Sequence, residues 1–97
     1  MSEFWYSLQG DLDLATAPKV EADLSVIIIA SDAHLRVDCS RLAFIDSTGV
    51  RVLVDAYHEL LARGRHMLVT NVRPGPRKVF EVLGLDDLLS YDRRVLR

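Results

Sequence analysis

The sequence predicts an α/β domain, in which helices pack on a sheet with one better-covered face. Short apolar segments with strand character alternate along the chain with segments of helical period, a pattern typical of this class. The 97 residues leave room for one domain, spanning residues 1–97, and 49% apolar with 27% charged residues is a globular composition. The polar alternation of residues 35–39 predicts that the other face of the sheet is less well covered.

The N-terminal segment predicts a strand that continues into an extended stretch. Residues 4–9 are rich in aromatic and apolar side chains, and this run ends at Gly10. Residues 11–14 continue in extended conformation. Their period of two places Leu12 and Leu14 on one face and the two intervening aspartates on the other.

A helix is predicted next. Thr16 is placed as its N-cap and Pro18 in its first turn. The β-branched run 26–29 is equally compatible with a strand, but the cap and the apolar spacing assign it to the end of the helix, which Ser31 breaks. The helical spacing is carried by four apolar residues, Val20, Leu24, Ile27 and Ile28.

The middle of the chain predicts a second strand and a second helix. Leu35, Val37 and Cys39 alternate with polar residues, as in a half-buried strand. Residues 42–45 lead from this strand toward the helix, which Gly64 closes as the C′ residue. The apolar stripe of this helix consists of Val50, Leu53, Val54, Tyr57, Leu60 and Leu61.

The last third predicts a strand over residues 66–71 and a third, short helix. The Pro-Gly-Pro sequence at 74–76 separates the two, and Gly84 ends the helix. Residues 85–97 have room for one more strand or short helix. The apolar positions of the third helix are Val79, Phe80, Val82 and Leu83.

Charge and hydropathy exclude several classes of function. The net charge is −2 at pH 7, and proline, glycine and acids interrupt the basic residues, so no nucleic-acid partner is expected. The longest apolar run, 26–30, is far shorter than the roughly 20 residues that span a bilayer. The first residues lack the basic start of a signal peptide. A cytoplasmic protein without membrane insertion is therefore expected.

Few residues offer chemistry. The single cysteine, Cys39, lies in an apolar strand, where a buried and inert thiol is expected. His34, His58 and His66 have no acid or cysteine at metal-ligand spacing, so no metal site is expected. The sequence has no glycine-rich phosphate loop and no base beside a nucleophile, so we expect neither a cofactor nor enzymatic activity.

The sequence Asp46-Ser47-Thr48-Gly49 stands at the start of the second helix. Helix N-termini present unpaired N–H groups and a partial positive charge, so Asp46 or Ser47 suits a cap and an anion is favoured there. A phosphate on Ser47 would be tolerated for the same reason. Gly49 is expected to leave the first turn open to another molecule. Capping alone, a modification site and anion binding all remain open from spacing alone.

Three motifs, in this order and at these distances, resemble the STAS domain. This family is shared by bacterial anti-sigma factor antagonists and the cytoplasmic tails of sulfate transporters. The resemblance covers nearly the whole chain. Its motifs are the signature at 44–50, the early turn Gly10-Asp11-Leu12-Asp13 followed by Thr16-Ala17, and Arg73-Pro74 with Val79-Phe80 and Leu83-Gly84-Leu85.

The resemblance implies a mixed sheet of four or five strands with helices mainly on one side. It also implies a protein-binding switch, an anti-sigma factor antagonist. In such antagonists a kinase that is also the anti-sigma factor phosphorylates the serine after the aspartate, which is Ser47 here; Thr48 is the less favoured site. Unphosphorylated Ser47 would mark the state that captures the anti-sigma factor and frees a sigma factor. A phosphatase would reset the switch, and ATP would belong to the kinase.

The predicted partner-binding surface surrounds this serine. Arg51 stands where the family often has a second glycine, and it suits pairing with phosphoserine, pairing with an acidic partner, or simple solvation. The alternative function is an accessory subunit of an ABC-type membrane transporter, which would use the same helix start to dock on the transporter ATPase. A ligand-sensing domain is a third reading. The expected partner-binding residues are Asp46, Ser47, Thr48, Gly49, Arg51, Asp11 and Asp13.

Overall fold

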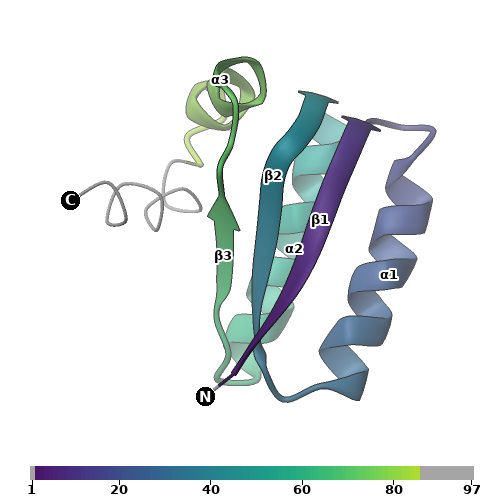
Figure 1. Ribbon diagram of the computed structural model, residues 1–97, viewed down its shortest axis with the longest axis vertical. Helices are drawn as coiled ribbons and strands as arrows, with labels where there is room; N and C mark the ends of the chain where they lie inside the picture. The colour runs from purple at the N-terminus through teal and green to yellow at the C-terminus, as the bar shows by residue number, and fades with distance from the viewer. Residues whose placement is uncertain (1, 86–97) are drawn as a thin grey trace.

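A computed structural model describes residues 2–85 of the chain. Three strands alternate with three helices in it, so the predicted α/β class is confirmed (Figure 1). The elements, in chain order, are β1 (Glu3–Leu12), α1 (Ala17–Ala30), β2 (His34–Ile45), α2 (Ser47–Ala62), β3 (Met67–Thr70) and α3 (Pro74–Val82).

The sheet has the order β1-β2-β3, and both neighbouring pairs are parallel. The expectation of a mixed sheet of four or five strands is therefore met only in part, because residues 2–85 form three strands of one direction. Parallel neighbours require crossover connections, and α1 and α2 supply them. The segment 86–97, part of the region where we predicted a further strand or short helix, lies outside the described residues.

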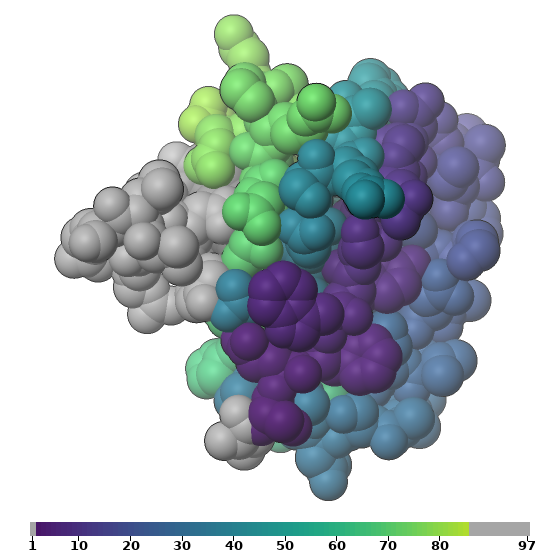
Figure 2. Space-filling model, in the orientation of Figure 1, coloured from purple at the N-terminus to yellow at the C-terminus, as the bar shows by residue number. Residues whose placement is uncertain are grey.

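The two faces of the sheet differ in covering, as predicted. In Figure 1 helix α2 lies behind the sheet and α1 lies beside it at the right. Leu35, Val37 and Cys39, which alternate along β2, are fully buried. The burial of Cys39 agrees with the predicted inert thiol. On the opposite face, which Figure 2 shows, strand side chains occupy the centre of the view, and Arg36 stacks over the exposed ring of Trp5 at 4.6 Å.

The β-branched run 26–29 is helical and belongs to α1, as the cap and spacing indicated. Ile28 is buried, while Val26 and Ile29 face solvent. A strand would place alternate residues on one face, whereas here Val20, Leu24 and Ile28 share the buried stripe. Packing of this stripe on the core overrides the intrinsic preference of the run for a strand.

The extended stretch predicted over 11–14 is wrong beyond Leu12. Leu12 is 1% exposed and ends β1, whereas Leu14 is 73% exposed in the turn that follows. Asp13 and Thr16 make a reciprocal capping box: Asp13 Oδ1 accepts from the Thr16 N–H, and Thr16 Oγ1 accepts from the Asp13 N–H. Thr16 precedes α1 as predicted, but its hydroxyl closes this turn and does not cap the helix.

Both glycines predicted at helix ends are confirmed. Gly64 and Gly84 have φ of 72° and 71°, a left-handed conformation that favours glycine. The Arg65 N–H donates to the Leu60 carbonyl at 2.8 Å, and the Leu85 N–H donates to the Phe80 carbonyl at 2.9 Å. These bonds satisfy carbonyls that α2 and α3 would otherwise leave unpaired at their C-termini.

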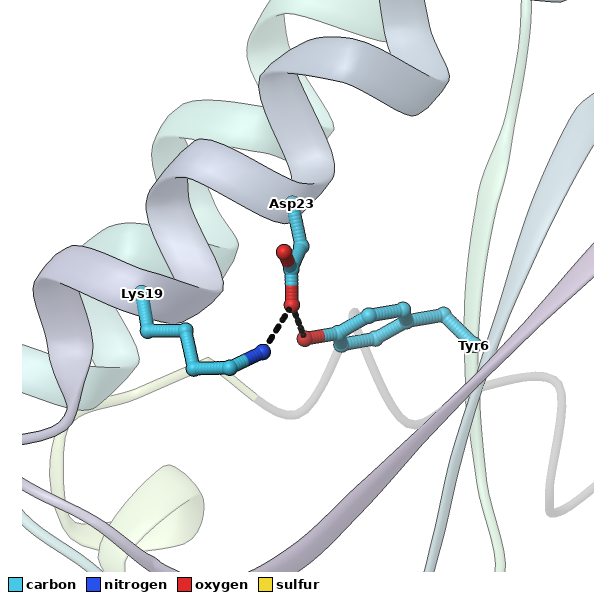
Figure 3. Close-up of polar contacts among 3 residues, drawn as sticks. All are labelled: Tyr6, Lys19 and Asp23. Atoms are coloured by element: carbon cyan, nitrogen blue, oxygen red, sulfur yellow. Dashed lines mark hydrogen bonds and ion pairs between the residues drawn. The ribbon is translucent and has the colours of Figure 1, made fainter.

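A polar contact ties β1 to α1. Figure 3 shows Tyr6 of β1 reaching Asp23 of α1, whose Oδ2 accepts from the Tyr6 hydroxyl at 2.7 Å and from Lys19 Nζ at 3.0 Å. The bonds from Tyr6 and then Lys19 hold the pKa of Asp23 below its usual value. Burial, followed by the bond to Asp23, raises the pKa of the Tyr6 phenol. The tyrosine therefore stays protonated and remains a donor.

A buried arginine joins the two loops at the opposite end of the sheet. Arg65 is 6% exposed, and its guanidinium donates to the Ala33 carbonyl at 2.8 Å and to the Ile28 carbonyl at 2.7 Å. Ile28 lies near the C-terminus of α1, where the helix dipole favours a cation. The side chain thereby connects the end of α1 to the loop before β3.

We predict that Arg65→Met lowers the free energy of unfolding by about 2–3 kcal/mol, because two buried carbonyls lose charged donors. Urea denaturation followed by circular dichroism measures the change. Arg63→Met is the matched control. Its half-exposed side chain pairs with Glu59 at 3.3 Å on the surface of α2, and a change within about 0.5 kcal/mol is expected. Equal effects of the two substitutions would contradict the role given to Arg65.

Candidate functional site

The predicted cap of the second helix is confirmed. Asp46 is the N-cap of α2, and its Oδ1 accepts a hydrogen bond from the Gly49 N–H at 3.0 Å. The Asp46 backbone N–H donates to the Leu12 carbonyl at 3.2 Å. One residue therefore satisfies the first turn of α2 and joins it to the end of β1.

The role we expected for Gly49 is wrong. Gly49 is buried, and a Cβ atom placed there would lie 2.5 Å from the Leu12 carbonyl oxygen and 2.9 Å from a side-chain carbon of Ile45. The space that glycine leaves free is thus filled from inside the protein, and no other molecule can enter it. Gly49 is required because α2 begins in direct contact with the end of β1.

Three residues near Gly49 reach the surface of the first turns of α2, whereas Val50 is buried. Ser47 is exposed, Thr48 is partly exposed, and the Arg51 side chain is 83% exposed. The Arg51 Nε lies 3.9 Å from Asp55 Oδ2, one helical turn further on. Ser47 and Arg51 are therefore exposed to solvent.

These exposed residues lie at the C-terminal end of the parallel strands. The turn after β1, the start of α2 and helix α3 all lie at this end of the sheet (Figure 1). Asp11 is exposed there, whereas the carboxylate of Asp13 accepts bonds within its own turn. In parallel α/β sheets, ligands bind at this end of the strands.

A groove of about 250 Å³ borders the site on the α1 side. Leu14 at its edge is the exposed leucine that the sequence analysis placed on the same face as Leu12. Charged side chains stand beside apolar ones, so the groove suits a mixed polar and apolar contact. The groove is lined by Leu14, Ala17, Pro18, Glu21, Thr48, Arg51, Val52 and Asp55.

A second hollow, of about 230 Å³, borders Ser47 on the α3 side and has mostly apolar walls. Val79, Val82 and Leu83 form these walls, with Lys78 beside them. Sequence analysis identified the apolar residues of this helix but did not predict that some of them form a surface beside Ser47. In the structure Phe80 is fully buried, while Val82 is 75% exposed. A short helix can bury only one stripe of side chains. Its four apolar residues exceed that stripe, and this excess could have indicated an exposed apolar surface.

A polar brace on the open face of the sheet precedes α3. Asn71 follows β3 with φ of 59°, and its Nδ2 donates to Asp38 Oδ1 at 2.9 Å. Ser40 Oγ donates to Asp38 Oδ2, also at 2.9 Å. The bond from Asn71, followed by those from Ser40, holds the pKa of Asp38 below its usual value. Asp38 therefore fixes the left-handed turn through which the chain leaves β3 toward α3.

The histidines do not form a metal centre. In the described part of the chain, no three histidine, cysteine or acidic residues gather as metal ligands. His34 and His66 stack with their ring centroids 5.0 Å apart, and His34 Nδ1 accepts from the His66 N–H. Among the helices of residues 2–85, none has the length and apolarity that crossing a bilayer demands.

The sequence profile of the STAS domain matches residues 3–95. The chain belongs to the STAS family. This STAS domain shares 32% identity over 81 residues with the anti-sigma-B factor antagonist of Listeria monocytogenes, covering 84% of this chain and 71% of the relative.

Solved STAS structures agree with the fold. The unphosphorylated form of the anti-sigma factor antagonist SpoIIAA superposes with a TM-score of 0.80 at 28% identity, covering 91% of this chain and 77% of that one. The phosphorylated form of SpoIIAA, from Bacillus, superposes with a TM-score of 0.71 at 28% identity, covering 91% of this chain and 80% of that one. For an anti-sigma factor antagonist from Mycobacterium paratuberculosis the TM-score is 0.81 at 26% identity, with 91% of this chain and 74% of that one covered.

We predict that Gly49→Ala lowers the free energy of unfolding by roughly 2–3 kcal/mol, because the new methyl group overlaps the Leu12 backbone. Gly75→Ala is the control: apart from its chain neighbours nothing lies within 4 Å of its added Cβ. The helix preference of alanine and its contact with the following Pro76 oppose each other, so a change within about 1 kcal/mol is expected. Urea denaturation compares the two. A neutral Gly49→Ala would contradict the tight contact between α2 and β1.

The Asp38 brace predicts a pH dependence. Because the folded pKa of Asp38 is lowered, its carboxylate stabilises the fold above the unfolded value of about 3.9, and this contribution is lost as the pH falls through the folded pKa. Asp38→Asn is therefore expected to be less stable than the unsubstituted protein at pH 6, with the gap narrowing below pH ~3.9. Asp32→Asn is the control, since the exposed Asp32 carboxylate accepts no hydrogen bond in the described structure. A gap independent of pH would contradict the assignment.

Proposed function

We propose that this STAS domain is an anti-sigma factor antagonist whose binding is switched by phosphorylation of Ser47. The observation that carries the proposal is the position of this hydroxyl. Ser47 is the first residue of α2, exposed beside a cap that Asp46 already provides. Because the fold does not use Ser47 as its cap, the serine is free for modification without loss of the helix start.

The surroundings of Ser47 supply a surface for a protein partner. We define the α2-start surface as the exposed side chains of Ser47, Thr48 and Arg51 together with Lys78 and Val82 of α3. Asp11 lies at its edge, while Asp46 and Gly49 hold it from beneath. Apolar walls on one side and charged residues on the other are the mixture that protein interfaces use.

Phosphorylation would change this surface strongly. A phosphate adds about −1.5 to −2 charges at neutral pH, next to the apolar hollow that Ser47 lines. A partner that covers the hollow would have to desolvate that charge, so affinity falls. In the same scheme the kinase is the anti-sigma factor and supplies the ATP. A phosphatase restores the binding state.

The names of the relatives support this reading. They are antagonists of anti-sigma factors, and SpoIIAA exists in phosphorylated and unphosphorylated forms. The expectation that the chain is not an enzyme agrees with those names. A regulator of a sigma factor acts where transcription occurs, so the proposal includes a cytoplasmic site of action for a single domain spanning residues 1–97.

The proposal predicts a phosphate on Ser47 and nowhere else. Intact-mass spectrometry after incubation with ATP and the cognate kinase-type anti-sigma factor should show one added phosphate, absent from Ser47→Ala and retained in Thr48→Ala. By calorimetry, the unphosphorylated chain and Ser47→Ala should bind the anti-sigma factor, and the phosphorylated chain should bind at least ~10-fold more weakly, about 1.4 kcal/mol. Neither phosphate nor binding, with a kinase active on a control substrate, would overturn the proposal and direct attention to the transporter-subunit alternative.

A further inference from the structure

Two cationic side chains from different helices border Ser47. Arg51 follows Ser47 by four residues in α2, so both side chains lie on the same side of the helix. Lys78 of α3 lines the same hollow as Ser47. Lys78 therefore borders Ser47 on the α3 side, and Arg51 lies one helical turn from Ser47, beside the groove on the α1 side.

Both cations are free to turn toward a new anion. The Arg51 side chain is 83% exposed, and its distance of 3.9 Å from Asp55 exceeds that of a hydrogen bond. Lys78 is exposed and makes no ion pair within residues 2–85. Exposed pairs of this kind contribute little, roughly 0–1 kcal/mol, so exchanging one for a phosphate costs little.

We propose that a phosphate on Ser47 is held within the chain by Arg51 and Lys78, forming a bridge between α2 and α3. This inference rests on the proposed phosphorylation of Ser47. The arginine offers a planar, bidentate donor set that matches phosphate oxygens, and the lysine adds a point charge from the opposite side. The first turn of α2 contributes its partial positive charge.

The bridge would close the α3 side of the α2-start surface. Val79, Val82 and Leu83 wall the hollow that Ser47 and Lys78 border, so a salt bridge across it covers apolar area that a partner would otherwise bury. The phosphorylated state then loses an apolar contact in addition to gaining charge. The held phosphate is also less accessible to a phosphatase, which makes the phosphorylated state longer-lived.

Asp46 and Asp55 oppose the bridge most directly, while Glu21, which lines the same groove as Arg51, and Asp11, at the edge of the surface, add further negative charge. Asp46 precedes Ser47 and is fixed by its bond to the Gly49 N–H, so its repulsion of the phosphate is constant. Asp55 competes with the phosphate for Arg51. Removing Asp55 should therefore strengthen the bridge, whereas removing either cation should weaken it, so substitutions act in opposite directions.

The test places phosphoserine at position 47 by genetic-code expansion and follows its ³¹P chemical shift through a pH titration. The second pKa of phosphoserine is ordinarily about 6. In the unsubstituted chain we expect it to fall by roughly half a unit to one unit, since opposite charges close by favour the dianion. Arg51→Gln and Lys78→Gln should each return it toward ~6, and Asp55→Asn should lower it further. Arg63→Gln, at the far end of α2, should leave it unchanged.

A pKa at or above the ordinary value, unmoved by Arg51→Gln and Lys78→Gln, would overturn the bridge. Alkaline phosphatase gives a second readout: the double variant Arg51→Gln/Lys78→Gln should lose its phosphate several-fold faster than the unsubstituted phosphoprotein, and equal rates would contradict the proposal. Both cations are exposed, so these variants should fold. Because no kinase is used, failure here leaves the phosphorylation of Ser47 intact, and that step is tested separately by incubation with the kinase.

Discussion

The contact between the first turn of α2 and the end of β1 controls the geometry of this domain. Because Gly49 has no side chain, the backbone of α2 can approach the Leu12 carbonyl closely. A Cβ atom at this position would collide with the carbonyl oxygen. The same carbonyl accepts a hydrogen bond from the Asp46 N–H. Asp46 is thereby turned inward as the cap, and Ser47, the next residue, is left facing outward. A packing constraint inside the protein thus determines which hydroxyl is displayed at its surface.

The other half of the site depends on a residue that does not belong to it. Asp38 lies in β2 on the open face of the sheet, and its bond to Asn71 holds the left-handed turn after β3. From this turn the chain enters α3, which carries Lys78 and Val82 to the hollow beside Ser47. The hydrogen bond between Asp38 and Asn71 therefore helps to position the apolar and cationic part of the surface, although neither residue belongs to that surface.

Local rules explain what could be predicted from the sequence. The cap at Asp46 and the helix ends at Gly64 and Gly84 depend on hydrogen bonds within a few residues, so residue type and spacing predicted them correctly. The exposure of Leu14 and the inward role of Gly49 depend on contacts between segments far apart in the sequence. Alternation of apolar and polar residues does not show at which residue a strand ends, so the exposure of Leu14 could not be predicted. A glycine in the sequence does not show whether the space beside it is filled by the protein itself or left open to a partner.

In the proposed switch, the electrostatics of the α2-start surface would connect binding of the partner to its release. Arg51 and Lys78 are exposed in the unphosphorylated chain, where an acidic partner can pair with them. A phosphate on Ser47 would compete for the same two cations at a high effective concentration, because it is attached to the chain. Partner and phosphate then exclude each other by sharing ligands as well as by repelling. Such a switch needs no change of fold, since exchanging the occupant of two surface side chains is sufficient.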